Sequence, residues 1–340
     1  MTIMTSYSLQ SHHSFGFPTH CQNYLSFDSV DSAIATLSTL RSQNQPIYIL
    51  GEGYNVVFTS DFPGTIVRNT MTGIKIIDED AHSTTLLVRA GENWDQLVAY
   101  CVERQLAGIE NLSYIPGSVG AAPVQNIGAY GAELKDVFIS LNAICLATGT
   151  MQAFQRSDCA FNYRESRFKH EKNAYLITDV TLRLQKKFQP NMQYPGIATE
   201  LNKKNITHPT LADMRHAVIA LRQRKIPDPA QIANAGSFFK NPVLRVSEYP
   251  TFINHHPGAP IYPLCAETFK VSAAWLIEQC DLKGMRHGEV GVSDQHALVL
   301  VHYGEGNPKD LLTLIEHIQK TVDRRFNIRL EPEVQIVHSS

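Results

Sequence analysis

The feature that most constrains this chain is a stretch of small residues, IPGSVGAAP at 115–123, which continues as QNIGAYG at 125–131. Its four glycines and two prolines leave backbone N–H groups without side-chain cover. Glycine also reaches the positive φ angles at which successive amides converge on one point. Such a loop can approach a phosphate or an aromatic ring closely. A glycine-rich turn in any large domain has a similar composition, so the stretch alone does not define a ligand site.

A second glycine loop lies about sixty residues earlier in the chain. The pattern predicts a strand at 47–50, a tight turn at 51–55 and another strand at 56–58. The chain has no GxxxxGK[ST] string, and the Rossmann fingerprint fails because Val56 replaces its third glycine. Glycines between two strands can still present amides to an anion. The two loops together indicate a dinucleotide held through the backbone.

Composition limits the classes of function. Length predicts two or three domains, and 30 Lys and Arg against 32 Asp and Glu give no global field for binding nucleic acid. No apolar run is long enough to insert into a membrane, and residues 1–7 have no secretory pattern. The histidines lack ligand spacing, and no CxxC pair occurs, so no metal site or disulfide framework is predicted. We expect a cytoplasmic, reduced protein.

Hydrophobic periodicity predicts a mixture of helices and strands. Ser272 is the expected N-cap and Gly284 the C-terminal stop of one helix, and Asn307-Pro308 is expected to start another. The helices are expected at 30–41, 94–101, 211–221, 273–280 and 308–322. Further strands are expected at 65–68, 74–77, 85–90, 139–146 and 176–184. A polar, proline-containing connection at 186–209 separates the two halves, and we place the domain boundary at residue 200.

Several motifs, in this order, resemble the UDP-N-acetylenolpyruvoylglucosamine reductase family. They are LGEGxN at 50–55, PGxVG at 116–120, NxGAYG at 126–131, YRESxFK at 163–169, NAGSFFKNP at 234–242 and LEPEV at 330–334. The resemblance spans residues 15–337. It implies an α+β protein with a two-subdomain FAD-binding fold of the vanillyl-alcohol oxidase/PCMH type at 1–200, split near 65–70. A smaller α+β substrate-binding domain would follow at 201–340.

The resemblance also implies an activity. A member of the family uses NADPH and bound FAD to reduce UDP-N-acetyl-3-O-(1-carboxyvinyl)-glucosamine to UDP-N-acetylmuramate, in peptidoglycan precursor synthesis. Hydride passes from flavin N5 to C3 of the enolpyruvyl group, and C2 then takes a proton. We expect non-covalent FAD, NADPH and a UDP-sugar as the ligands, and a monomer that binds neither nucleic acid nor membrane.

The resemblance assigns the cofactor contacts to the two glycine loops and their surroundings. One departure is Tyr54, which stands where the family usually has a serine, so a short hydroxyl contact is in doubt there. Tyr130 could pack on the flavin or belong to the core. The implied FAD-binding residues are Gly51, Glu52, Gly53, Tyr54, Asn55, Pro116, Gly117, Ser118, Gly120, Ala121, Gln125, Asn126, Gly128 and Tyr130.

Three residues match the family's catalytic positions. Ser237 matches the proton donor to C2, although the same motif could be an ordinary turn. Arg164 matches the residue that faces the substrate carboxylate, where a guanidinium fork suits a forming oxyanion; the alternative is a salt bridge to Glu165 or Glu171. Glu333 matches the catalytic carboxylate, which could orient Arg164 or polarise the enol. Glu331 competes with it, because two residues apart in a strand share a face.

The expected substrate-binding residues are Tyr163, Tyr194, Lys225, Asn241 and His296. Tyr194 matches a mobile-loop tyrosine that closes over the UDP portion in one subtype of the family. Lys225 would bind the diphosphate or the nicotinamide, or else it complements the end of a helix. Gln295 is an alternative to His296.

Two other functions remain open from the sequence. An FAD-dependent oxidase of an alcohol or sugar would share the glycine loops but lack the motifs at 234–242 and 330–334. A silent flavin- or nucleotide-binding module would have lost charged or hydroxyl residues at the catalytic positions, which Arg164, Ser237 and Glu333 retain.

Overall fold

The computed structural model describes residues 6–192 and 194–338. The chain divides into two compact units, each assembled from separate stretches of sequence. The first unit contains the described residues of 1–7, 21–52 and 63–223, and the second contains those of 8–20, 53–62 and 224–340. The first glycine loop therefore begins in one unit and ends in the other.

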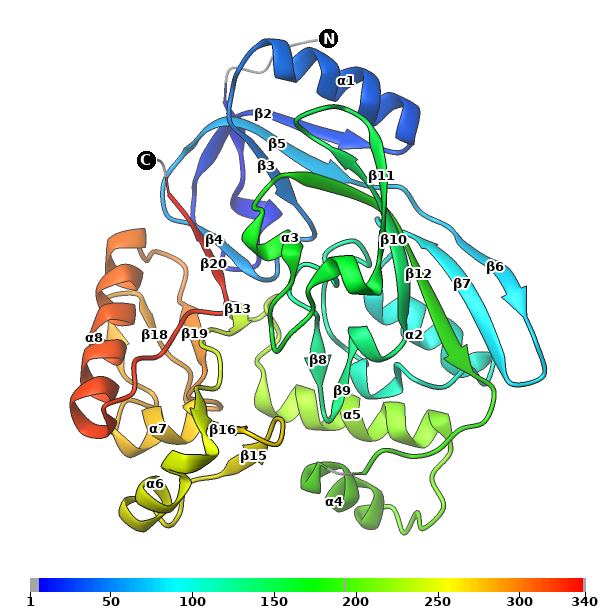
Figure 1. Cartoon of the computed structure of the whole chain (residues 1–340). Helices are drawn as coiled ribbons and strands as arrows, with labels where there is room; N and C mark the ends of the chain where they lie inside the picture. Colours follow the sequence, from blue (N-terminus) through cyan, green and yellow to red (C-terminus); the bar gives the residue numbers. More distant parts are fainter. Residues whose placement is uncertain (1–5, 193, 339–340) are drawn as a thin grey trace. The chain divides into compact units, whose positions relative to one another are not determined.

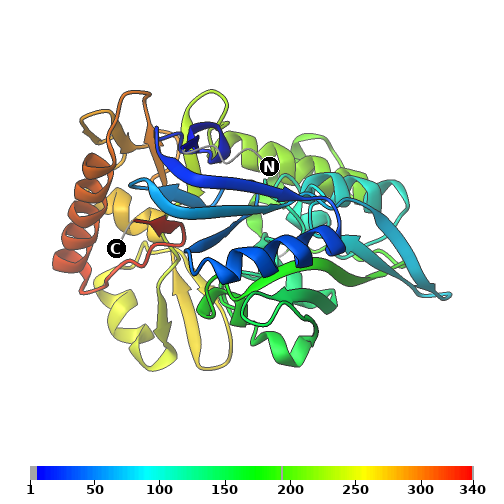
Figure 2. The same cartoon turned by 90° about the horizontal axis from the view of Figure 1, so that it is seen from above.

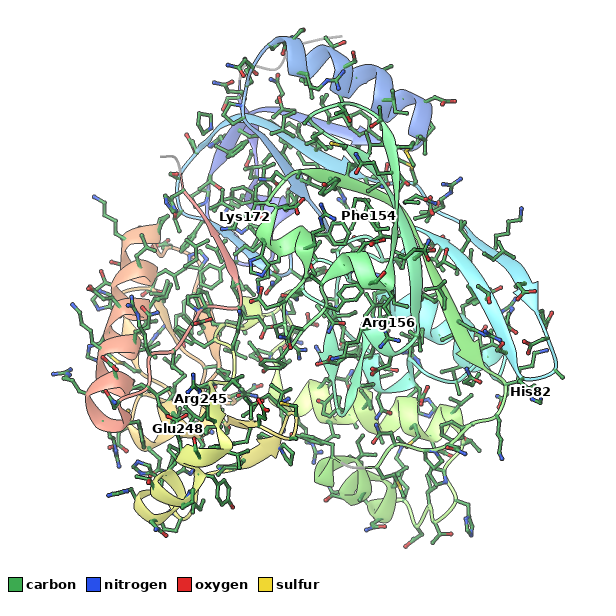
Figure 3. The ribbon with its side chains drawn as sticks, in the orientation of Figure 1. His82, Phe154, Arg156, Lys172, Arg245 and Glu248 are labelled. Carbon is green, nitrogen blue, oxygen red and sulfur yellow. The ribbon has the colours of Figure 1, made fainter. Side chains whose placement is uncertain are left out.

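A five-stranded antiparallel sheet forms the larger part of the first unit (Figure 1). Its strands are, in spatial order, β11 (Met151–Gln155), β10 (Phe138–Cys145), β12 (Tyr175–Gln185), β7 (Ser83–Arg89) and β6 (Ile74–Glu79). Helix α2 (Trp94–Glu103) packs its apolar stripe on this sheet, and Leu97 and Val98 are fully buried there. His82 lies in the turn between β6 and β7 (Figure 3).

A second sheet in this unit precedes residue 70. It has the order β1 (Tyr7–Ser8), β2 (His20–Phe27), β5 (Phe62–Asn69) and β3 (Ile47–Leu50), and β3 runs parallel to β5. Helix α1 (Val30–Ser42) buries Ala33, Leu37 and Leu40 against these strands and lies beside them in Figure 2. The predicted subdomain split near residues 65–70 falls at the end of β5.

The remaining elements of the first unit are short, apart from helix α5 (Leu211–Lys225), the last residues of which pass into the second unit. Helix α4 (Pro195–Lys203) packs on α5 through Ile197 and Leu201. The others are β8 (Gly128–Ala129), β9 (Ala132–Glu133), α3 (Arg167–His170), and the 3-10 turns η2 (Glu110–Leu112), η3 (Leu134–Asp136) and η4 (Arg156–Cys159). Arg156 is exposed at the start of η4 (Figure 3).

The second unit has three small sheets around one apolar core. Helices α7 (Ala273–Gln279) and α8 (Pro308–Phe326) share that core with the first of these sheets. That sheet has the order β13 (Ala233–Ser237), β19 (Val299–His302), β18 (Val290–Val292), β17 (Arg286–His287). The others are β14 (Val243–Arg245), β16 (Thr268–Val271), β15 (Ile261–Pro263), and the parallel pair β20 (Gln335–Val337) and β4 (Val56–Phe58). The short helices are η1 (Gln10–His12), η5 (Val246–Glu248) and α6 (Tyr249–His255).

Most predicted helices and strands are present, with local corrections. Asn307 caps α8 by accepting from the Asp310 N–H, as predicted. Gly284, however, does not end α7. The helix ends at Gln279, and Asp281 takes the left-handed position with φ 58. Its N–H donates to the Glu278 carbonyl, which makes a helix stop without glycine.

The polar connection at 186–209 contains a helix that the sequence analysis does not predict. This helix, α4, has a Pro at its first turn and two buried apolar side chains. The predicted boundary at residue 200 falls inside this helix, and the first unit continues to Gln223.

Candidate active site

The two glycine loops meet within the first unit. A Cβ added at Gly51 would lie 3.1 Å from the Ala121 Cβ and 3.4 Å from the Ser118 Oγ. A Cβ at Gly120 would lie 2.6 Å from the Cβ of Ala90, so this position accepts no side chain. Small residues therefore suit both loops, because Gly51 lies close to the side chains of Ser118 and Ala121, and Gly120 lies close to Ala90, which follows β7. Such a cradle fits an FAD diphosphate held by backbone amides.

Residues at the start of α2 fix the second loop. The Asn93 side chain caps the helix through Gln96 N–H and also donates to Glu52 Oε2 at 3.3 Å. The Trp94 N–H donates to the Gly117 carbonyl at 2.9 Å. Glu52, which was expected to contact the cofactor, is thus joined to the element that supports the second loop.

The end of the first loop belongs to the second unit. Gly53 has φ 78, and a Cβ there would lie 2.1 Å from the His12 carbonyl oxygen, so only glycine fits. Asn55 Nδ2 donates to the Glu333 carbonyl at 3.3 Å, and the Asn55 carbonyl accepts from the Gln335 N–H at 3.0 Å. These bonds join the GEGYN turn to the segment that carries the LEPEV motif.

Asn126 has an internal role. Its side chain is fully buried, donates to Glu133 Oε2 at 3.0 Å and to the Asn162 carbonyl at 3.1 Å, and accepts from the Lys135 N–H. Both side-chain N–H groups and Oδ1 of Asn126 are engaged within the protein, so we propose that its side chain shapes the loop rather than donates to the cofactor. Of the other expected contacts in this stretch, Pro116 is exposed, Ala121 and Gln125 are partly buried, and Ser118 is buried.

Arg164 packs directly against Gly128 in the first unit. Its Nη2 donates to the Gly128 carbonyl, and a Cβ at Gly128 would lie only 2.8 Å from Nη1. Arg164 has φ 53, and its guanidinium lies 5.2 Å from the ring centroid of Tyr163. The motif therefore pairs an arginine in a left-handed turn with a glycine that leaves room for it.

The acidic neighbours of Arg164 have other cationic partners. Glu171 binds Arg167 at 2.8 Å, and Glu165 lies 3.0 Å from His170 Nε2 and 3.8 Å from Lys169 Nζ.

Tyr130 and Tyr194 contact each other within the first unit. Their ring centroids lie 4.9 Å apart in an edge-to-face arrangement, and both rings border the α4–α5 core. Asn111, which is buried, donates to the Tyr130 carbonyl at 2.8 Å and to the Asn191 carbonyl at 3.1 Å. The structure thus brings an expected flavin contact and an expected substrate contact together.

Ser237 is placed by an asparagine turn at the end of β13. The Gly236 N–H donates to Asn234 Oδ1 at 3.0 Å, and Gly236 has φ 73. The fully buried Asn234 also donates to the Pro227 and Ile232 carbonyls. A register irregularity between Asn234 and Ser237 bends the strand there, and Ser237 stays partly exposed. Its hydroxyl is therefore held at a fixed backbone position and remains accessible.

The LEPEV motif lies beside this serine in the second unit. Pro332 forms an isolated bridge with Phe239, and the Glu333 N–H donates to the Phe238 carbonyl at 2.8 Å. The prediction that Glu331 and Glu333 share a strand face is wrong, because the strand β20 begins only at Gln335. Glu331 is 74% exposed and pairs with Lys240 at 3.6 Å, whereas Glu333 is partly buried.

The other expected substrate residues of the second unit have distinct environments. His296 lies in the segment that leads into β19, and the N–H of Leu298 donates to its Nδ1 at 3.2 Å. Burial and, to a smaller extent, the charge of Lys225 lower the pKa of His296 to about 4. The ring is neutral at physiological pH, with Nδ1 as acceptor and Nε2 as donor. Asn241 Oδ1 accepts from the Ala273 N–H at 2.9 Å.

Sequence reasoning missed the polar residues that support the first unit's loops. Asp95, Arg215 and Arg222 hold the backbone around Tyr114. Burial lowers the pKa of Arg222, and its electrostatic neighbours include Tyr130 and Arg164. The seven-residue spacing of the two arginines on a helix was the one available signal.

No helix among residues 6–192 and 194–338 is both long and apolar enough to span a bilayer. No group of three His, Cys, Asp or Glu side chains in these ranges could hold a metal ion.

Comparisons with known proteins agree with this geometry. A family model described as "UDP-N-acetylenolpyruvoylglucosamine reductase, C-terminal domain" matches residues 228–337, and one described as "FAD binding domain" matches 22–155. A UDP-N-acetylenolpyruvoylglucosamine reductase of Flavobacterium johnsoniae is 40% identical and covers 99% of this chain and 100% of its own. The protein of the same name from Ralstonia nicotianae is 41% identical, over 97% of this chain and 98% of its own length.

Solved structures agree on the fold. UDP-N-acetylenolpyruvylglucosamine reductase from Thermus caldophilus matches with a TM-score of 0.69 at 21% identity, over 99% of both chains. A solvent-stable cholesterol oxidase matches with a TM-score of 0.52 at 11% identity, over 97% of this chain and 86% of its own. These likenesses confirm the predicted α+β, oxidase-type FAD-binding architecture.

Proposed function

Because the chain belongs to the UDP-N-acetylenolpyruvoylglucosamine reductase family, we propose that it reduces UDP-N-acetyl-3-O-(1-carboxyvinyl)-glucosamine to UDP-N-acetylmuramate with NADPH and FAD. The observation that carries this proposal is identity of about 40% to curated reductases along nearly the whole of both chains. Arg164, Ser237 and Glu333 are all retained. The match of residues 228–337 to the reductase's C-terminal domain favours the reductase over an oxidase.

The glycine cradle fits the cofactor. Gly51 and Gly120 lie where any side chain would fill the space beside Ser118, Ala121 or Ala90. FAD, when bound, supplies the hydride chemistry, taking a hydride from NADPH and delivering it to C3 of the enolpyruvyl group. Gly120 accepts no side chain and Gly51 has little room for one, so the loops are suited to backbone contacts with a diphosphate.

We assign the proton transfer to Ser237. Addition of hydride at C3 places negative charge on C2 and the adjoining carboxylate. The Ser237 O–H bond then breaks as a C–H bond forms at C2, and solvent returns a proton to the serine oxygen. The fixed Asn234–Gly236 turn supports this role, since a weak acid acts only when it is held in line with its acceptor.

Arg164 and Glu333 are the proposed charged groups of the reaction. The Arg164 guanidinium would bind the substrate carboxylate and stabilise the charge that develops there. We propose that Glu333 polarises the enol, since its backbone is bonded to the residue after Ser237. Tyr163, Tyr194, Lys225, Asn241 and His296 are the proposed contacts to the UDP-sugar or to NADPH.

We also propose that the protein acts as a cytoplasmic monomer, because its nucleotide substrates, NADPH and a UDP-sugar, are cytoplasmic metabolites.

Anaerobic absorbance spectroscopy tests the function. The purified protein should carry a flavin band that NADPH bleaches and that the enolpyruvyl nucleotide restores. Rapid recovery with oxygen alone and none with the nucleotide would indicate the oxidase. A preparation that binds no flavin would contradict the proposed function.

A further inference from the structure

An ion pair in the first unit joins helix α2 to helix α5. Arg215 Nη1 donates to Asp95 Oδ1 at 2.5 Å, and Nη2 donates to Oδ2 at 2.9 Å. The two side chains are mostly buried, with 16% and 27% of their surfaces exposed. Two parallel bonds from one guanidinium fix both the distance and the plane of the carboxylate. The pair is therefore more rigid than an ordinary surface salt bridge.

The same two helices hold the backbone of Tyr114. Asp95 Oδ1 accepts from the Tyr114 N–H at 2.5 Å, and Arg222 Nε donates to the Tyr114 carbonyl at 2.9 Å. Arg215 and Arg222 are about two turns apart and share a face of α5. Both polar backbone groups of Tyr114 thus depend on side chains of α2 and α5.

Tyr114 needs this support because of its conformation. Its φ of 60 lies in the left-handed region, which is costly for a residue other than glycine. Its side chain is 39% exposed, so burial compensates little of that cost. The residues on either side are held by Trp94, whose Nε1 donates to the Leu112 carbonyl at 3.0 Å and whose N–H donates to the Gly117 carbonyl.

The charge state favours the pair at neutral pH. Burial raises the pKa of Asp95, but the bonds from Arg215 and from the Tyr114 N–H outweigh it, and the net pKa lies below the ordinary value. The carboxylate is therefore ionised when the protein is at work.

We propose that Asp95 and Arg215 are positioning residues for the FAD diphosphate loop at 115–121. By fixing Tyr114, they set the direction in which the chain enters this loop and thus where the amides of Gly117 and Ser118 point. The inference rests on the proposed function, since the ligand of the loop is the FAD of that function.

Flavin binding to the apo-protein tests this role without any turnover. We would measure the affinities of Asp95→Asn and Arg215→Gln for FAD and for riboflavin, which lacks the diphosphate, by flavin fluorescence. We expect FAD affinity to fall about tenfold or more in each variant, the effect of losing a hydrogen bond to a charged group. Riboflavin affinity should stay unchanged. The double variant should be no weaker than either single one, because the two residues act as a unit.

Two further variants keep the test decisive. Arg215→Lys keeps the charge and should recover part of the FAD affinity, and it replaces Arg215→Gln if that variant does not fold. Arg183→Gln removes the exposed pair between Arg183 and Asp80 at 3.0 Å and should leave both affinities unchanged. Unchanged FAD affinity in folded Asp95→Asn and Arg215→Gln, or an equal loss for both flavins, would overturn the inference. A wild-type chain that binds no FAD would instead contradict the proposed function itself.

Discussion

The backbone N–H of Glu333 donates a 2.8 Å hydrogen bond to the carbonyl of Phe238, the residue that follows Ser237. This bond joins two motifs that lie almost a hundred residues apart in the sequence. It places the carboxylate-bearing segment against the serine-bearing one inside a single compact unit. Glu331, only two residues away, projects to the surface beside Lys240.

The two glutamates should therefore respond differently to the same change. We expect Glu333→Gln to lower turnover about 10²-fold or more, because an aligned acid–base group contributes on that scale. Glu331→Gln should change turnover little, since exposed ion pairs contribute about 0–1 kcal/mol to stability. Steady-state kinetics of both variants, with flavin content as a check, measures the difference. Equal losses in the two would remove the reason to prefer Glu333.

Gly128 should be intolerant of any side chain. A Cβ there would meet Arg164 Nη1 at 2.8 Å, Glu133 Cγ at 2.9 Å and the Ala132 carbonyl oxygen at 3.0 Å. We expect Gly128→Ala to displace the guanidinium, to raise KM for the enolpyruvyl substrate about tenfold, and to cost about 1–3 kcal/mol of stability. Gly258→Ala is the control, because a Cβ at Gly258 meets nothing within 4 Å. Matching behaviour of the two alanine variants would show that Arg164 does not depend on this glycine.

Asn234 should contribute to both stability and turnover. Its buried side chain makes three hydrogen bonds, to the Pro227 and Ile232 carbonyls and from the Gly236 N–H. Asn234→Ala leaves these groups without partners, and we expect a loss of about 2–4 kcal/mol in the free energy of unfolding. Exposed Asn254 supplies the matched control. Urea denaturation of both variants gives the comparison, and a loss below about 1 kcal/mol for Asn234→Ala would contradict the role assigned to the turn.

Stability should fall with acid because of His13. Burial lowers its pKa to about 4, its Nδ1 has no partner among the described residues, and its Nε2 lies 3.3 Å from the Phe17 carbonyl. The unfolded chain takes up the proton near pH 6.5, whereas the folded chain does so only near pH 4, so stability is lost as the pH falls through this window. We expect His13 to account for a loss of about 2 kcal/mol in the free energy of unfolding between pH 7 and pH 5.

Urea denaturation at several pH values checks this share. His13→Gln keeps a donor for the Phe17 carbonyl and cannot titrate, so its stability should depend less on pH than that of the wild type between pH 7 and pH 5. Identical pH profiles for wild type and His13→Gln would show that another group is responsible.

The elements with strong periodicity were predictable from the sequence, and the ends of elements were less so. The apolar positions of α8 and its Asn307-Pro308 start define the helix unambiguously. Helix α7 was expected to stop at Gly284, because glycine favours the left-handed position. Asp281 takes that position instead, and buried Leu282 follows it. At this helix end, the packing of Leu282 determines where the helix stops, rather than the preference of glycine for the left-handed conformation.

The residues of the candidate site that belong to sequence motifs were predictable. The roles of residues that depend on contacts with distant parts of the chain were not. Gly51 and Gly120 were predictable as parts of the two glycine loops, and neighbouring atoms leave little or no room for a side chain at either position. The internal role of Asn126 depends on Glu133, Asn162 and Lys135, which no local pattern links to it. The Asp95–Arg215 pair spans 120 residues of sequence for the same reason.

The most direct measurement of the central claim is rapid mixing of Ser237→Ala under anaerobic conditions, with the two half-reactions followed separately. Bleaching of the flavin by NADPH should proceed at the wild-type rate, because Ser237 has no part in it. Reoxidation by the enolpyruvyl nucleotide should slow about 10²–10⁴-fold, the contribution of an aligned proton donor. Reoxidation at the wild-type rate would contradict the assignment of Ser237 as the donor to C2.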